Sequence, residues 1–250
     1  MTIPNVLTIA GSDSGGGAGI QADLKTFAAL RTYGASAITA VTAQNTQGVR
    51  GVHQVPPEII DAQIADVFED LQIAAVKIGM IGNAEAIEAV AAALARASGA
   101  PIVLDPVMVA ASGDPLLEPG AESVLKTRLL PLADVLTPNL PEAARLLSRD
   151  RAEDEAAMRE QAEALGAMGP QAVLIKGGHG TGDEALDILF DGRDFARFTA
   201  LRVATKNVHG TGCTLSSAIA ALLARGFTLH EAVREAKMYL TSALSEADKL

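Results

Sequence analysis

Short aliphatic runs without polar alternation recur along this chain, and they restrict its possible folds more than any other feature. Such runs are typical of strands covered on both faces of a sheet, and we predict strands at 6–10, 37–41, 75–78, 102–104, 135–136 and 173–175. Segments of helical period lie between them, at about 20–30, 57–71, 84–97, 141–147 and 153–168. Because strands alternate with helices, the sequence predicts a three-layer αβα fold of the α/β class, with a mainly parallel central sheet flanked by helices.

The pattern changes after Lys176. Asp191-Gly192 is a preferred hairpin turn, and it joins two strand-like segments at 185–190 and 195–203. We therefore expect a small antiparallel hairpin at one edge of the sheet, followed by two helices at about 214–225 and 229–247. No linker, repeat or low-complexity tract interrupts the sequence, so we expect residues 1–250 to form a single domain.

Composition excludes several classes of protein. The net charge of −10 and the absence of a basic run argue against binding to nucleic acid or to a membrane surface. A single cysteine excludes an internal disulfide framework and a CxxC metal site. Aromatic residues make up only 3% of the chain, so the core must be aliphatic. No signal-type segment or apolar run of membrane-spanning length occurs, and we expect a soluble, cytoplasmic protein.

A first cluster of glycines lies between a predicted strand and a predicted helix. Five of the nine residues from Gly11 to Gly19 are glycine, which allows backbone N–H groups to approach a ligand closely. A tight turn from strand to helix would need glycine as well. Gly17-x-Gly19-x-x-Ala22 also matches a dinucleotide-binding pattern, but no acidic residue occurs between Asp23 and Glu58 to hold a ribose. An NAD-dependent oxidoreductase is therefore the weakest of the functions considered.

A second cluster, Thr205 to Thr214, leads directly into a predicted helix and contains the only cysteine, Cys213. Backbone N–H groups at a helix N-terminus form an anion site, and the helix dipole favours negative charge there. A thiol in this first turn is expected to have a lowered pKa and to act as a base or nucleophile. The alternative is that Cys213 is an inert buried residue, the usual role of a free cysteine.

Polar residues follow three of the predicted strands: Asp105, Asn139 and Lys176. Ligands of open α/β sheets bind beyond the carboxyl ends of strands, so we expect these residues to converge on one crevice. Asp105 and Glu142 would supply oxygen ligands for Mg²⁺, and Lys176 a positive charge for phosphate. Structural roles are also open: Asn139 and Glu142 fit a helix capping box, Asp105 fits a turn, and Lys176 fits a snorkelling lysine.

Seven segments form a specific joint pattern in order along essentially the whole chain. They are A-G-S-D-S-G-G-G-A-G-I-Q-A-D (10–23), T-A-Q-N-T (42–46), K-I-G-M (77–80), L-D-P-V-M (104–108), T-P-N-L-P-E (137–142), K-G-G-H (176–179) and H-G-T-G-C-T (209–214). This pattern resembles that of the hydroxymethylpyrimidine/phosphomethylpyrimidine kinases, the thiamine-biosynthesis members of the ribokinase-like superfamily. The resemblance implies a kinase that uses ATP and Mg²⁺ to phosphorylate 4-amino-5-hydroxymethyl-2-methylpyrimidine and then its monophosphate.

The resemblance also implies a role for individual residues. The catalytic group would be Lys176 with the anion hole Gly210, Thr211, Gly212 and Cys213, where Cys213 replaces the aspartate base of most sugar kinases in the superfamily. Metal binding falls to Asp105 and Glu142, and nucleotide binding to Lys176, Thr205 and Lys237. Gln44 would read the aminopyrimidine, since its amide offers both a donor and an acceptor. The other pocket residues would be Gly11, Asp23, Met80 and Val107.

Two further readings remain open beside this one. Pyridoxal is nearly isosteric with the pyrimidine alcohol, so a pyridoxal or pyridoxine kinase is the closest alternative. A non-catalytic pyrimidine-binding relative is the other, although the presence of Asp105, Glu142, Lys176 and Cys213 argues against it, because a binder needs no metal and anion ligands. The family resemblance is also the only basis for expecting a homodimer.

Overall fold

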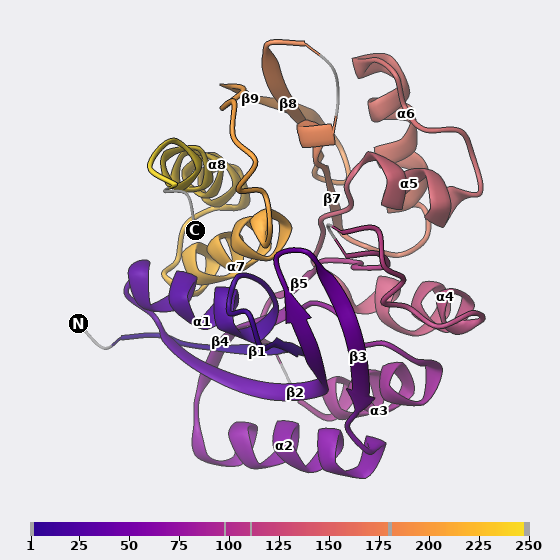
Figure 1. Ribbon diagram of the computed structural model, residues 1–250, viewed down its shortest axis with the longest axis vertical. Helices are drawn as coiled ribbons and strands as arrows, with labels where there is room; N and C mark the ends of the chain where they lie inside the picture. The colour runs from indigo at the N-terminus through magenta and orange to yellow at the C-terminus, as the bar shows by residue number, and fades with distance from the viewer. Residues whose placement is uncertain (1–2, 98, 111, 180–181, 248–250) are drawn as a thin grey trace.

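The strands of the computed structural model, which describes residues 3–97, 99–110, 112–179 and 182–247, form one sheet in the order β3-β2-β1-β4-β5-β6-β7-β8-β9 (Figure 1). The central strands pair in parallel: β2 (Tyr33–Asn45), β1 (Asn5–Asp13), β4 (Ile73–Ile78), β5 (Ile102–Leu104), β6 (Val135–Leu136) and β7 (Ala172–Ile175). Antiparallel strands close both edges: β3 (Gly48–Gln54) next to β2, and the hairpin of β8 (Glu184–Phe190) and β9 (Phe195–Leu201) next to β7. The mainly parallel sheet and the edge hairpin are confirmed.

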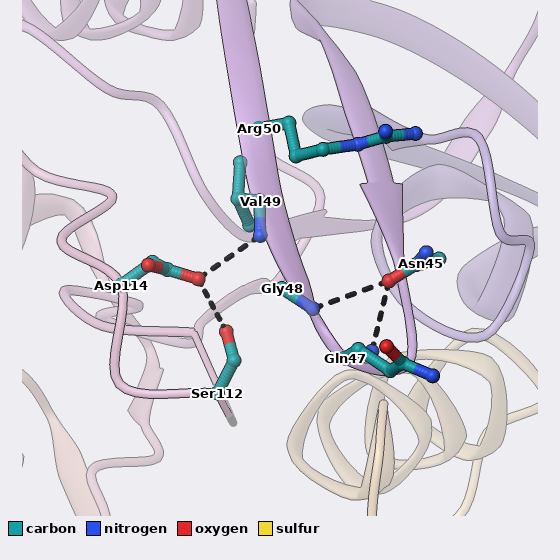
Figure 2. Close-up of a pocket in the computed structure, with 7 residues that line it drawn as sticks. All are labelled: Asn45, Gln47, Gly48, Val49, Arg50, Ser112 and Asp114. Carbon is teal, nitrogen blue, oxygen red and sulfur yellow. Dashed lines mark hydrogen bonds between the residues drawn. The ribbon is translucent and has the colours of Figure 1, made fainter.

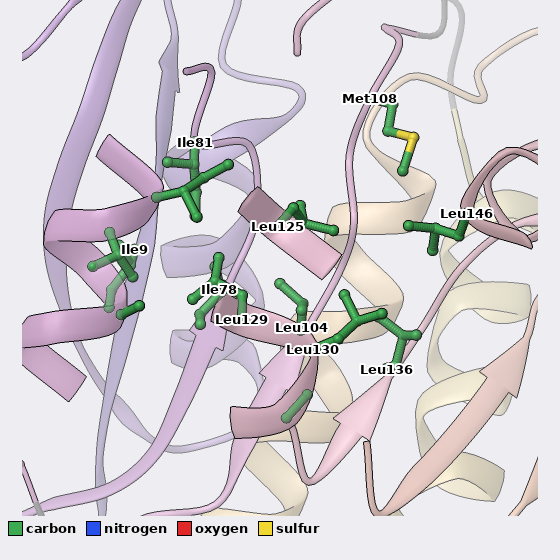
Figure 3. Close-up of a cluster of buried hydrophobic side chains, with 14 of the residues drawn as sticks. Ile9, Ile78, Ile81, Leu104, Met108, Leu125, Leu129, Leu130, Leu136 and Leu146 are labelled. Atoms are coloured by element: carbon green, nitrogen blue, oxygen red, sulfur yellow. The ribbon is translucent and has the colours of Figure 1, made fainter. Parts of the chain in front are cut away.

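Helices cover both faces of this sheet, and neighbouring residues of a buried strand point into opposite layers. Val6 packs into the layer of α1 (Gly19–Ala29), α7 (Thr211–Ala224) and α8 (Leu229–Ser245). Leu7 packs into the layer of α2 (Pro57–Asp70), α3 (Ala84–Arg96), α4 (Ala121–Val124), α5 (Leu140–Leu147) and α6 (Glu155–Gly166). Figure 3 shows the aliphatic side chains of this second layer, among them Ile9, Ile78 and Leu104 from successive strands. The three-layer αβα architecture is confirmed.

Two parts of the chain differ from the sequence-based expectation. The strand β3 was not predicted, because Gly48–Gln54 contains two glycines, lies largely exposed at the sheet edge and has no aliphatic run. No element was predicted at 121–132 either, where α4 continues into one π-helical turn (Leu125–Leu129) and a 3₁₀ turn (Leu130–Leu132). These turns bury Leu125, Leu129 and Leu130 in the core, so packing fixes a segment whose helical pattern is too irregular to read.

Helix α8 has 17 residues. Within the described ranges, no helix is both long and apolar enough to cross a membrane.

The helices differ in how they begin, and the difference matters for the site. Side chains cap α3, α5, α6 and α8 at their N-termini, through Asn83, Asn139, Asp154 and Thr228. Helix α7 begins after Gly210, which has a φ of +79° and gives no side-chain cap. The first turn of α7 therefore lacks the side-chain acceptor that caps these four helices.

Candidate active site

Two strand ends place a lysine and an aspartate in direct contact. Asp105 follows β5 and Lys176 follows β7, and Lys176 Nζ lies 2.7 Å from Asp105 Oδ1 with both side chains almost fully buried. Burial lowers the pKa of Lys176, but Asp105 and Glu142 raise it more, so the net pKa is above its ordinary value and the lysine stays charged. The structure thus brings these residues together as their positions at strand ends predicted.

Glu142, on the first turn of α5, lies within the electrostatic range of this pair. It forms a capping box with Asn139: Glu142 Oε2 accepts the Asn139 N–H at 2.8 Å, and Asn139 Oδ1 accepts the Glu142 N–H at 2.8 Å. Burial and repulsion from Asp105 raise the pKa of Glu142, while Lys176 and the Asn139 N–H lower it, and the result is a pKa of about 7. The predicted capping box of Asn139 and Glu142 is therefore confirmed. The Glu142 carboxyl group is also repelled by the Asp105 carboxylate.

This crowding bears on the predicted metal site. With both carboxylates ionised, Asp105, Glu142 and Lys176 carry a net negative charge, which a divalent cation would neutralise. In the described part of the chain, no group of three or more His, Cys, Asp or Glu side chains is arranged to hold a metal ion. Mg²⁺ in kinases is commonly held by one or two carboxylates together with substrate phosphates and water. The residues present fit that mode of binding rather than an all-protein cage.

The N-terminus of α7 lies against the Lys176–Asp105 pair. A Cβ atom built on Gly212 would lie 3.4 Å from Asp105 Oδ2 and 3.4 Å from Lys176 Nζ. Among the described residues the N–H groups of Gly212 and Cys213 form no hydrogen bond, whereas those of Thr211 and Thr214 donate to Val208 O and Gly210 O. The N–H groups at the start of α7 and the buried Lys176 ammonium group thus lie close together. This arrangement is one that binds a phosphate group.

Gly210→Ala is expected to displace this helix N-terminus and to slow phosphoryl transfer by about 10²-fold, the usual cost of misplacing reacting groups by an ångström. A Cβ atom there would lie 1.8 Å from the carbonyl oxygen of Gly17. Gly120→Ala is the matched control: Gly120 also precedes a helix, has a φ of +87° and has open space around its Cα. Both variants carry the strain of about 1–2 kcal/mol for a left-handed residue, so equal turnover in the two would contradict the prediction.

Cys213 lies in the first turn of α7 and remains partly exposed, but its acidity is opposite to the prediction. Burial is the largest influence and raises the pKa of the thiol, as do Asp23 and Asp105. Lys77 and the Gly19 N–H lower it, and the net pKa is about 11. The predicted lowering of the Cys213 pKa is therefore wrong, because desolvation and two carboxylates outweigh Lys77 and the Gly19 N–H.

Sequence reasoning missed Lys77, which is completely buried near the carboxyl end of β4. Its Nζ lies 2.9 Å from both carboxylate oxygens of Asp23, which also accepts hydrogen bonds of 2.6 Å from Thr8 and Ser217. Asp23 was expected to line the pyrimidine pocket, but its carboxylate is fully buried and held by these partners. In this structure Asp23 positions other residues and does not face open space. The only signal in the sequence is a lysine inside a buried-strand run.

The other predicted pocket residues lie at the carboxyl ends of β1, β2, β4 and β5. The Gly11 N–H donates to Met80 O at 3.0 Å, and a Cβ on Gly11 would lie 2.7 Å from Met80 Sδ. Gln44 is half-buried on β2, and its Oε1 accepts from Thr42 Oγ1 at 3.2 Å. Val107, partly exposed, donates its N–H to Asp105 O. The structure brings Gly11 against Met80 but shows no contact that joins Val107 to Gln44.

A hollow of about 380 Å³ lies along the turn between β2 and β3, where Asn45, Gln47 and Gly48 line it (Figure 2). Asp114 crosses from the segment after β5 to this turn: its Oδ2 accepts the Val49 N–H at 2.9 Å and the Ser112 hydroxyl at 2.7 Å. Asn45 Oδ1 accepts the Gln47 N–H at 2.9 Å and so holds the turn itself. The segment around Asp114 is therefore bound to β3, whose Val49 pairs with Gln44 of β2.

The two additional residues predicted to bind nucleotide have internal partners. Lys237 Nζ, on α8, lies 2.6 Å from Asp187 Oδ2, and both side chains are buried. Asp187 also accepts the N–H of Gly177, which directly follows Lys176, at 2.8 Å. Thr205 Oγ1 accepts the Asn207 N–H at 3.1 Å. Asp187, which sequence reasoning did not single out, thus connects α8 to the residue after Lys176.

In the glycine cluster after β1, the four N–H groups of residues 15–18 are already occupied. Asp13 accepts the N–H groups of Gly15, Gly17 and Ala18 through its carboxylate and that of Gly16 through its carbonyl oxygen. The expectation that these N–H groups approach a ligand is therefore wrong in this structure. Turn formation, the alternative reading, accounts for them.

The sequences of named relatives match this chain over nearly its whole length. A hydroxymethylpyrimidine/phosphomethylpyrimidine kinase of Rhizobium meliloti is 59% identical over 244 residues, which cover 98% of this chain and 91% of the relative. One from Escherichia coli is 53% identical over 246 residues, covering 98% and 92%. Both relatives are thus matched almost end to end.

Solved structures give the same picture of the fold. A phosphomethylpyrimidine kinase from Clostridium difficile superposes with a TM-score of 0.86 at 45% identity, covering 96% of this chain and 99% of that one. A Bacillus subtilis pyridoxal kinase in complex with ADP superposes with a TM-score of 0.91 at 36% identity, covering 100% and 94%. A model of the phosphomethylpyrimidine kinase family matches residues 13–250. This match, together with the relatives over 50% identical, shows that the chain belongs to the phosphomethylpyrimidine kinase family.

Proposed function

We propose that this protein transfers the γ-phosphoryl group of ATP to the hydroxymethyl group of 4-amino-5-hydroxymethyl-2-methylpyrimidine and then phosphorylates the monophosphate. The observation that carries the proposal is the pair of unpartnered N–H groups at Gly212 and Cys213, beside the buried Lys176–Asp105 pair. Phosphoryl transfer depends on positioning and on neutralising charge more than on covalent chemistry. The site supplies both the positioning groups and the neutralising charge, at the carboxyl ends of the parallel strands.

Each group in the site has a distinct task in this proposal. The N–H groups of Gly212 and Cys213 donate to the oxygens of the transferring phosphoryl group, and Lys176 Nζ neutralises part of its charge. Asp105 and Glu142 would hold Mg²⁺, which when bound supplies charge neutralisation at the phosphate oxygens. Asp105 also orients Lys176 through the 2.7 Å contact between them. Nucleotide use is supported by relatives of this fold solved with ADP and with AMP-PCP.

Cys213 is the proposed base for the acceptor hydroxyl in the first step. A hydroxymethyl group must lose a proton as it attacks phosphorus, and the Cys213 sulfur is the titratable group of the anion-hole turn. The second step attacks through a phosphate oxygen that is already ionised at neutral pH, so it needs no base. The two steps of one enzyme therefore place different demands on the same residue.

A product assay tests the proposal most directly. The protein is incubated with ATP, Mg²⁺ and the pyrimidine alcohol, and products are resolved as monophosphate and diphosphate over time. We expect the monophosphate to appear first and then to be converted. Absence of both phosphates, with the same preparation folded and binding ATP, would contradict the proposed function and favour a non-catalytic relative.

Pyridoxal phosphorylation is the second candidate function. The observation in its favour is the TM-score of 0.92 to a Staphylococcus aureus pyridoxal kinase solved with AMP-PCP and pyridoxal, at 35% identity. The same assay run with pyridoxal in place of the pyrimidine separates the two. Faster turnover of pyridoxal than of the pyrimidine alcohol would make this the main function.

Gln44→Leu is expected to weaken binding of the pyrimidine by about one to two decades while leaving ATP binding nearly unchanged. In the proposed site the Gln44 amide pairs with the amino group and the adjacent ring nitrogen, and an unpaired buried polar edge costs about 1–3 kcal/mol. Titration calorimetry with each ligand separately measures the effect. Gln47→Leu, at an exposed position of the turn beyond Asn45, is the matched control. Equal weakening of both ligands would instead indicate a folding defect.

The remaining expectations rest on the sequence and, for the homodimer, on the family resemblance alone. A homodimer, a cytoplasmic location and a single domain over residues 1–250 stay predictions. All described strands do belong to one sheet, which supports a single catalytic unit.

A further inference from the structure

The glycine-rich loop after β1 is organised around one buried carboxylate. Asp13 Oδ1 accepts the Gly15 N–H at 2.8 Å, and Oδ2 accepts the N–H groups of Gly17 at 3.0 Å and Ala18 at 2.8 Å. The side chain is only 2% exposed. Burial raises the pKa of Asp13, but hydrogen bonds from His209 and from the Ala18 and Gly15 N–H groups lower it below its ordinary value. The carboxylate therefore stays ionised and fixes the shape of the loop.

The same carboxylate connects this loop to the anion hole, 196 residues away in sequence. His209 Nε2 lies 2.9 Å from Asp13 Oδ2, and His209 directly precedes Gly210. The two segments also touch through their glycines. A Cβ on Gly17 would lie 2.5 Å from His209 Cδ2, and one on Gly210 would lie 1.8 Å from Gly17 O. The contact therefore leaves no room for either segment to move toward the other.

The other end of the loop connects to the strand that carries the proposed pyrimidine reader. Ser14 Oγ donates to Gln44 O at 2.7 Å and accepts the Gln44 N–H at 2.9 Å. A Cβ on Gly15 would lie 3.2 Å from Asn45 Cα. A continuous series of contacts thus runs from Gln44 through Ser14, Asp13 and His209 to Gly210.

We propose that Asp13 and His209 are a pair of positioning residues that sets the distance between the acceptor-binding strand and the anion hole. Neither residue contacts a reacting atom in this scheme. Their bond holds the Ser14–Gln44 contact at one end of the loop and the Gly210 turn at the other. The inference rests on the proposed function, because it assigns the acceptor to the Gln44 end and the phosphoryl group to the Gly210 end.

The test compares four variants in the full-length protein: His209→Ala, Asp13→Asn, the double variant and His209→Gln. We expect each of the first two to lower kcat of the first phosphorylation by about 10- to 100-fold, with KM for ATP within about twofold of wild type. Because both act through one bond, the double variant should be no slower than the slower single variant. The glutamine amide nitrogen can occupy the place of Nε2, so His209→Gln should recover most of the loss.

His230→Ala is the matched control, since it breaks another His–Asp contact, His230 Nε2 to Asp191 Oδ2 at 3.0 Å, at an exposed position. It should leave kcat and KM unchanged. Wild-type kinetics in His209→Ala, a rise in KM for ATP at unchanged kcat, additive losses in the double variant, or the same loss in His230→Ala would each overturn the proposal.

Amide hydrogen exchange gives a readout that does not depend on the reaction. His209→Ala should speed exchange of the Gly15, Gly17 and Ala18 N–H groups, which Asp13 protects in this structure, while the α3 amides keep their wild-type rates. Unchanged loop exchange would overturn the positioning role. If the wild-type protein phosphorylates no pyrimidine while loop exchange rises as expected, the proposed function fails and the Asp13–His209 connection stands.

Discussion

Replacing Cys213 with alanine is expected to slow the first phosphorylation by about 10²–10⁴-fold, the usual worth of a general base. The first step must remove a proton from a neutral hydroxymethyl group, and the variant has no group at this position to accept it. The second step should lose far less, because its attacking oxygen carries a charge already. Separate rates for the two steps, measured with the alcohol and with the monophosphate, provide the comparison within one variant.

The raised pKa of Cys213 gives this prediction a pH signature. With a thiol pKa of about 11, the thiolate is a small fraction of the free enzyme at neutral pH. Its population rises about tenfold for each pH unit below the pKa, and kcat/KM reports the free enzyme. For the alcohol, kcat/KM should therefore rise between pH 7 and 10 in the wild-type protein and not in Cys213→Ala. Cys213→Asp should recover part of the first step and show a flat profile over this range, because a carboxylate is ionised throughout.

Two results would reduce Cys213 to a residue that only lines the pocket. One is first-step turnover near that of wild type in Cys213→Ala. The other is a pH profile for the alcohol that is the same in wild type and variant. Catalysis would then rest on the N–H groups of α7, on Lys176 and on the bound metal.

The positions of Asp105 and Lys176 could be predicted because strand ends carry information in α/β proteins. Each is the first polar residue after an aliphatic run, and the carboxyl ends of parallel strands meet at one edge of the sheet. The order of strands was not needed for this inference. Glu142 followed from the helix that Asn139 begins.

Lys77 and the acidity of Cys213 could not be predicted, because both depend on burial by distant segments. Lys77 is paired with Asp23, which lies 54 residues away on α1. Without the position of α1, the sequence shows Lys77 only as part of a strand. The helix N-terminus at Cys213 is visible in the sequence, but the carboxylates of Asp23 and Asp105 that oppose it are not. Local motifs therefore located the thiol correctly and gave the wrong sign for its pKa shift.

The role of the glycine cluster after β1 could not be predicted from the sequence either. Its composition allows either a ligand-binding loop or a tight turn, and composition alone cannot decide between them. The two readings are decided by the direction of the Asp13 side chain, whose carboxylate accepts three N–H groups of the loop. His209 adds a partner from the far end of the chain that no local pattern shows.

Lys77→Met is expected to lower the free energy of unfolding by about 3–5 kcal/mol, a large share of the 5–15 kcal/mol typical of a domain. The substitution keeps most of the length of the side chain and leaves Asp23 buried without its counter-charge. Urea unfolding followed by circular dichroism measures the loss. Arg128→Met is the matched control: it breaks the exposed contact between Arg128 and Glu88 and should cost at most about 1 kcal/mol.

The double variant Lys77→Met/Asp23→Asn separates charge from packing. If the loss comes from the uncompensated carboxylate, removing that charge should restore a large part of the stability, since Asn keeps an acceptor for one of the Thr8 and Ser217 hydroxyls and its amide nitrogen can donate to the other. A single variant no less stable than Arg128→Met would show that Asp23 tolerates burial alone. Ser217 lies one helical turn beyond Cys213, so Asp23 connects α7 to β1 and β4. Because the Lys77 charge lowers the Cys213 pKa, its loss should also raise that pKa and slow the first phosphorylation more than the second.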